Sequence, residues 1–146
     1  MELFLPHIIM DRFEKIRELG DGEFSTTYLV KRKSDGVKFV IKQFDIGDYD
    51  DHEITVASQE AETMKNMVHQ NIVKFEESWQ EDNCFCILME FCDNGDLDSC
   101  IRDAGSCHFS ESKVVNWLAQ ICQALKHCHD RKVMHRDIKV SFNFIF

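Results

Sequence analysis

Short runs with apolar, β-branched and aromatic residues, separated by turn sequences, occupy much of the first half of the chain, a pattern typical of β-strands. Residues 13–19, with Phe13, Ile16 and Leu19 apolar, form the first such run, which ends at a glycine. Runs at 26–30 and 37–41 flank a Ser-Asp-Gly turn sequence at 34–36. Because Gly and Asp favour tight turns, these two runs are predicted to form a β-hairpin.

A period of three to four residues replaces this pattern at 53–67 and predicts an amphipathic helix. Strand-like runs return at 72–79 and 84–89, which predict a second hairpin joined by residues 80–83. Three strands, one helix and two strands follow one another in this prediction. The predicted fold class is therefore α+β, with a five-stranded antiparallel sheet and one helix packed on it.

Helical spacing prevails from residue 95 onward, and its clearest part is a helix at 110–130. Ser110 is a suitable N-cap, and Glu111 complements the positive end of the helix dipole. The apolar stripe of this helix consists of Val114, Leu118, Ile121, Leu125 and Cys128. Such a stripe is typical of a helix that packs on one face.

The composition of the chain argues against some classes of binding partner. With 17 Lys and Arg against 26 Asp and Glu, the net charge is −9, which argues against nucleic acid and anionic membranes as partners. The seven cysteines include no C-x-x-C pair, and no secretion signal precedes them, which indicates reduced thiols in the cytoplasm. The apolar start is too short to cross a bilayer, so residues 1–10 are interpreted as an N-terminal extension.

The cysteines and histidines do not predict a metal site. We expect the thiols of Cys84 and Cys86 to point to opposite faces of their strand, and His127 and His129 to diverge on their helix. Structural zinc requires four converging ligands. We therefore expect no metal-binding residues.

Residues 19–27 fit the phosphate-binding pattern G-x-G-x-x-G-x-V imperfectly. Gly20 and Gly22 allow the backbone to approach nucleotide phosphates, but Ser25 replaces the third glycine and Thr27 the valine. An ordinary hairpin turn remains the alternative for this segment.

Lys42 lies in an otherwise apolar strand, 22 positions after Gly20, as a lysine that grips nucleotide phosphates should. Glu60 follows in the middle of the predicted helix and can pair with Lys42 to direct its amine toward the phosphates. Glu62 or Glu53 are alternative partners. A solvent-facing lysine on the polar side of a strand is the other interpretation.

Two further motifs follow. Residues 84–97 are interpreted as an apolar strand that runs into a short linker. The alternative interpretation of this segment is a plain buried strand followed by a helix whose N-cap is Asp93 or Asn94. His-Arg-Asp at 135–137, followed by Lys139, fits the catalytic loop of serine/threonine kinases. Phe142 stands where that pattern has a Mg²⁺-binding Asn.

In order and spacing, these motifs resemble the protein kinase superfamily over residues 11–139. The NIMA-related serine/threonine kinases are similar in Val-Ile-Lys at 40–42 and in residues 69–73, 90–97 and 124–132. The resemblance implies a small lobe at 11–89, a hinge at 90–96 and the start of a large lobe at 97–139. Residues 140–146 depart from the family and form an aberrant hydrophobic tail.

The resemblance also implies ATP and Mg²⁺ as cofactors and a protein substrate with a Ser or Thr acceptor. Asp137 would be the catalytic base, and Lys139 would neutralise the transferred phosphoryl group. The residues implied for ATP binding are Leu19, Gly20, Gly22, Thr27, Val40, Lys42, Glu60, Met89, Glu90, Cys92 and Asp96. Family members with ciliary or centrosomal roles suggest a centrosome or cilium besides the cytoplasm.

The sequence contains no Asp-Phe-Gly motif. We therefore expect a kinase domain truncated after the catalytic loop and inactive as it stands, with a tail of intron read-through or an alternative exon. The alternative is a non-catalytic splice product or pseudokinase-like fragment that binds nucleotide weakly or binds a partner. A partner protein would then cover the apolar stripe of the helix at 110–130.

Overall fold

The computed structural model describes residues 11–22, 25–46, 51–81, 83–136 and 138–139, with the backbone alone for 51–53. These residues form two compact units. The first contains the residues up to 66 together with 75–91, and the second contains 67–74 together with the residues from 92 onward.

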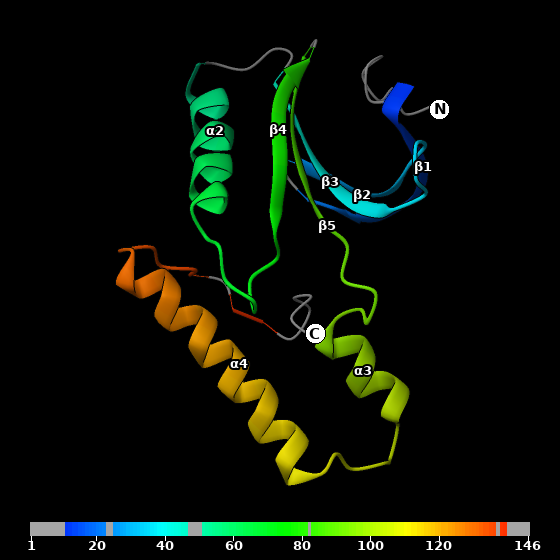
Figure 1. Cartoon of the computed structure of the whole chain (residues 1–146), viewed down its shortest axis with the longest axis vertical. Helices are drawn as coiled ribbons and strands as arrows, with labels where there is room; N and C mark the ends of the chain where they lie inside the picture. Colours follow the sequence, from blue (N-terminus) through cyan, green and yellow to red (C-terminus); the bar gives the residue numbers. More distant parts are fainter. Residues whose placement is uncertain (1–10, 23–24, 47–50, 82, 137, 140–146) are drawn as a thin grey trace. The chain divides into compact units, whose positions relative to one another are not determined.

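The first unit contains the predicted antiparallel sheet (Figure 1). Its five strands, in the order β1-β2-β3-β5-β4, are β1 (Phe13–Asp21), β2 (Ser25–Arg32), β3 (Lys38–Asp45), β4 (Phe75–Glu81) and β5 (Cys84–Glu90). The prediction of five strands is confirmed, but β4 begins three residues later than expected and extends into the predicted turn. Residues 72–74 lie before β4 and belong to a segment of the second unit.

Helix α2 (Asp51–Lys65) covers part of one face of this sheet (Figure 1). It begins and ends two residues before the predicted helix. Ala57 and Ala61 are 1% and 4% exposed and lie in one cluster with Phe44, Phe85 and Ile87 of the sheet. Small side chains let the helix approach closely, so α2 is positioned by the burial of its alanine edge.

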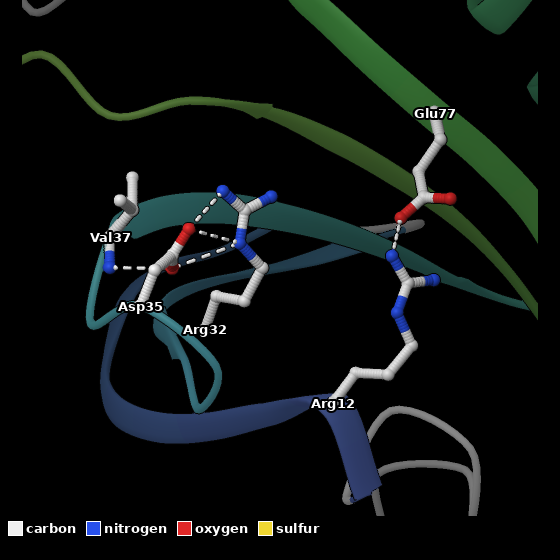
Figure 2. A network of polar contacts seen from close by, with 5 residues as sticks. All are labelled: Arg12, Arg32, Asp35, Val37 and Glu77. Atoms are coloured by element: carbon white, nitrogen blue, oxygen red, sulfur yellow. Dashed lines mark hydrogen bonds and ion pairs between the residues drawn. The ribbon is translucent and has the colours of Figure 1, made fainter.

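The opposite face of the sheet carries an aromatic cluster built on Phe13, Tyr28 and Phe39. All three side chains are buried, although none of the described helices is part of this cluster. Arg12, just before edge strand β1, forms an ion pair with Glu77 on the other edge strand, β4 (Figure 2). This ion pair joins the two edges of the curved sheet, and the described residues that bury this face all belong to the strands.

The hairpin between β2 and β3 turns where the sequence predicted it. Gly36 has φ +75°, a conformation that favours glycine, and its N–H donates to the Arg32 carbonyl oxygen at 2.8 Å. Asp35 accepts hydrogen bonds from the Arg32 guanidinium and from the Val37 N–H (Figure 2). These bonds hold the pKa of Asp35 below its usual range, the Arg32 contact being the larger cause.

The second unit contains α3 (Leu97–Ala104) and α4 (Glu111–Asp130). The predicted cap of α4 is confirmed, since the Ser110 hydroxyl accepts from the Lys113 N–H at 3.4 Å. Residues 67–74 pack on this helix through Asn71, which is 7% exposed and donates to the Gln120 carbonyl oxygen and the Gln123 side chain.

The first half of the apolar stripe of α4 is exposed in the described part of the chain, whereas Ile121, Leu125 and Cys128 are half-buried. Val114 is 47% exposed and Leu118 is 59% exposed, whereas Ala124 is buried. Val115 adds a further exposed aliphatic side chain. No described helix is long and apolar enough to cross a membrane.

The expectation that Cys84 and Cys86 point to opposite faces of the sheet is wrong. Residues two apart on a strand share a face. Cys86 is buried in the aromatic cluster, and Cys84 packs against the same cluster. Burial raises the pKa of the Cys86 thiol to about 12.

Candidate functional site

The strand register gathers several predicted nucleotide-binding residues on one face of the sheet. Thr27 of β2 lies opposite Lys42 of β3, and Val40 lies opposite Met89 of β5. Val40 and Lys42 are two residues apart, so their side chains share a face. This is the face on which α2 packs, since Met89 also contacts the cluster of α2 and the sheet.

Lys42 and Glu60 form the charged centre of this face. Lys42 Nζ lies 2.8 Å from Glu60 Oε1, and the side chains are 28% and 36% exposed. The pair predicted from the sequence is therefore present, with Glu60 rather than Glu62 as the partner, and the side chain of Glu53 lies outside the described residues. The buried alanine edge of α2 holds Glu60 in place.

Phe44 is a third member of this centre that the sequence analysis did not identify. Its ring centroid lies 4.8 Å from Lys42 Nζ, within cation–π distance. Phe44 is also part of the cluster that seats α2. Its position two residues after Lys42 on the same strand was the available signal, because such residues share a face.

The glycine segment forms the connection between β1 and β2. Gly20 pairs with Thr27, and the Gly22 N–H donates to the Ser25 carbonyl oxygen at 2.9 Å. A Cβ on Gly22 would lie 3.2 Å from that oxygen, so this position favours glycine. A Cβ on Gly20 would meet no atom within 4 Å, so the backbone there is open to approach by a ligand.

Ser25 stands on the same face of the sheet as Lys42. It pairs with Phe44 across β2 and β3, and Thr27, two residues further on, pairs with Lys42. The Ser25 side chain is half-buried. The bulk that replaces the third glycine of the pattern therefore lies beside the charged centre.

The other predicted residues of the first unit lie in β1, β3 and β5. Leu19 is half-buried in β1, and Val40 is 7% exposed in the middle of the sheet. Met89 and Glu90 are the last residues of β5, and both are half-buried. Val40 and Met89, which pair with each other, give the face an apolar region beside the ion pair, whereas Glu90 pairs with Phe39 of the opposite face.

The remaining predicted residues lie in the second unit. Cys92 is buried, and Asp96 is the N-cap of α3, where its carboxylate accepts from the Ser99 N–H at 2.6 Å. This bond lowers the pKa of Asp96. The alternative that Asp93 or Asn94 caps this helix is therefore wrong.

The catalytic-loop sequence is only partly described. Lys139 is exposed, whereas Asp137 lies outside the described residues. Arg136 has φ +65°, a backbone conformation that costs energy for a residue with a side chain.

Among the described residues, no three His, Cys, Asp or Glu side chains come together in a group that could hold a metal ion. The phosphate end of a nucleotide fits the Lys42 face by charge and by its open glycine backbone. Mg²⁺ is usually held by one or two carboxylates together with substrate phosphates and water, so the absence of such a group among the described residues does not bear on Mg²⁺.

Comparison with known proteins agrees with this geometry. Residues 13–146 match the protein kinase domain family. The chain is 39% identical over 136 residues to the serine/threonine-protein kinase Nek1 of Mus musculus and 40% identical over 136 residues to Nek5 of Homo sapiens. It is 34% identical over 138 residues to the probable serine/threonine-protein kinase nek3 of Dictyostelium discoideum.

Each of these matches covers 93% of the chain but only 11%, 19% and 12% of the respective relative. The chain therefore spans a small part of the length of these relatives. The resemblance to NIMA-related kinases predicted from the motifs is confirmed by these matches.

Proposed function

Because the chain belongs to the protein kinase domain family, we propose that its first unit binds ATP weakly and that its catalytic-loop residues correspond to those that serve phosphoryl transfer to Ser or Thr in an active kinase. The observation that carries the proposal is the Lys42–Glu60 ion pair, 2.8 Å long, on the sheet face that also holds Thr27 and Val40. A lysine fixed in this way presents a localised positive charge to phosphate oxygens.

The proposed nucleotide site on this face has an apolar part and a charged part. Val40 and Met89 supply apolar contact for the adenine, and Lys42 supplies charge for the α- and β-phosphates. The backbone around Gly20 can approach the phosphates without steric hindrance. Leu19, Gly22, Thr27, Glu90, Cys92 and Asp96 complete the proposed nucleotide-binding set.

In the proposed reaction, Asp137 accepts the proton of the substrate hydroxyl and Lys139 neutralises charge on the transferred phosphoryl group. Mg²⁺ supplies further charge neutralisation in this reaction class. The 146 residues contain no Asp-Phe-Gly motif and have Phe142 at the position of the second ligand. We therefore propose that this polypeptide by itself binds nucleotide weakly and transfers no phosphate.

A second candidate function follows from the same departures. Ser25 in the glycine segment and Phe142 in the catalytic loop favour a non-catalytic, pseudokinase-like chain that binds nucleotide or a partner protein. The exposed stripe on α4, with Val114 and Leu118, would be the surface for that partner.

The experiment is a calorimetric titration of the 146-residue polypeptide with Mg-ATP, followed by a phosphotransfer assay on casein. We expect weak binding that Lys42→Met abolishes and that Lys65→Met leaves unchanged, because Lys65 lies on the exposed side of α2. We expect no transfer above an Asp137→Asn control.

Two results would contradict the proposal. Equal binding by the Lys42→Met variant and the unaltered chain would show that the ion pair does not hold the phosphates. Transfer above the Asp137→Asn control would show that the chain is active without the missing ligands.

We also propose a cytoplasmic location, since the cysteines described are all free thiols. A centrosomal or ciliary location rests on the resemblance to NIMA-related kinases alone. Fluorescence microscopy of the tagged chain beside a centrosomal marker tests both.

A further inference from the structure

We propose that the packing of residues 67–74 on α4 is an acid-sensitive contact, maintained only while the side chains of His69 and His127 are both neutral. The two imidazole rings lie with their centroids 4.9 Å apart, at an interplanar angle of 48°. Both residues belong to the second unit, and no step of the proposed phosphoryl transfer uses them.

The hydrogen bonds of His69 require a neutral ring. Its Nδ1 accepts the Asn71 N–H at 3.1 Å, so this nitrogen carries no proton. Protonation of Nδ1 would place an N–H against an N–H and break the bond. Asn71 is also the residue that fastens the segment to α4 through Gln120 and Gln123.

His127 is equally unsuited to a positive charge. Its Nε2 is inaccessible to solvent and has no hydrogen-bond partner among the described residues. A neutral ring can leave this nitrogen as an unprotonated acceptor, whereas a charged ring would bury an N–H donor without a partner. Two charged rings 4.9 Å apart would also repel each other.

The surroundings of His127 also disfavour a positive charge on its ring. Burial, Arg131 on the same helix and His69 on the facing segment lower the pKa of His127 from its ordinary value of 6.5. Asp130 opposes this shift, but its carboxylate is held by Lys126 at 2.7 Å.

Because the pKa of His127 is lowered in the folded chain, the contact loses stability as the pH falls. Below its ordinary pKa, His127 takes up a proton more readily in the unfolded state than in the folded one. The stability that the neutral contact provides is therefore complete above about pH 6.5 and is lost as the pH falls below that value. Residues 67–74 follow α2 in the chain, so acid would release the segment that leads out of that helix.

The first test is an NMR titration of the histidine Cε1–H signals of the full chain. The matched control is the same chain unfolded in urea. We expect the His127 signal of the folded chain to titrate at lower pH than the same signal of the unfolded chain, because its pKa is lowered from the ordinary value of 6.5. Equal midpoints in the folded and unfolded chain would overturn the proposal, and this measurement needs no variant to fold.

The second test is hydrogen exchange of residues 67–74 at about pH 7.5 and about pH 5.5, corrected for intrinsic rates. We expect protection in acid to fall by up to about tenfold for each unit by which the folded and unfolded pKa values differ. His127→Phe keeps an aromatic ring that does not titrate and should reduce this loss, whereas His129→Gln should retain it in full. The same loss of protection in His127→Phe would contradict the proposal.

Discussion

Replacement of Lys132 by glycine should stabilise the second unit. Lys132 follows α4 and has φ +63°, the left-handed conformation that a side chain disfavours. Its N–H donates to the His129 carbonyl oxygen and the Val133 N–H donates to that of Cys128, both at 3.0 Å. These are the two bonds of a Schellman motif, in which glycine is the preferred residue.

The expected change in the free energy of unfolding is the difference between two opposing effects. A left-handed conformation costs a residue with a Cβ about 1–2 kcal/mol. Glycine loses more chain entropy on folding, which costs about 0.5–1 kcal/mol. Lys132→Gly should therefore raise the free energy of unfolding by about 0.5–1 kcal/mol, or the melting temperature by about 2–5 °C.

The assay is thermal unfolding of the full chain followed by the helical circular dichroism signal. The matched control is Arg131→Gly, because Arg131 has φ −95° and gains nothing from glycine. This control should lose about 0.5–1 kcal/mol. An unchanged or lowered melting temperature in Lys132→Gly would refute the argument that backbone strain is stored at this position.

Two further predictions concern the nucleotide face and the exposed stripe. Ser25→Gly should tighten Mg-ATP binding by about threefold in calorimetry, because it removes bulk beside Lys42, whereas Ser34→Gly in the exposed turn should change nothing. Leu118→Gln, at a position 59% exposed, should change the free energy of unfolding by less than about 0.5 kcal/mol and reduce association in light scattering. Ala124→Gln, at a position 5% exposed, should cost about 1–3 kcal/mol, and equal losses in both variants would show that the stripe is covered.

Many features of this protein could be predicted from residues that lie close together in the sequence. The turn at 34–36 and the Ser110 cap were predicted because their hydrogen bonds join residues only a few positions apart. The Lys42–Glu60 pair was predicted over a separation of 18 residues, since the motif spacing fixed both positions. The alternative interpretation of residues 84–97 placed the cap of α3 at Asp93 or Asn94 instead of Asp96, because several neighbouring Asp and Asn residues satisfy the same local rule.

Tertiary structure alone decided the contacts that join distant segments. The Arg12–Glu77 ion pair spans 65 residues and the Asn71–Gln123 bond spans 52, so no local pattern contains both partners. The two-residue period of a strand determines which residues share a face, but not that the sheet curls and buries its aromatic face without any of the described helices. Strand periodicity is a property of the local backbone, whereas curling and the docking of residues 67–74 on α4 depend on which surfaces meet after the chain folds.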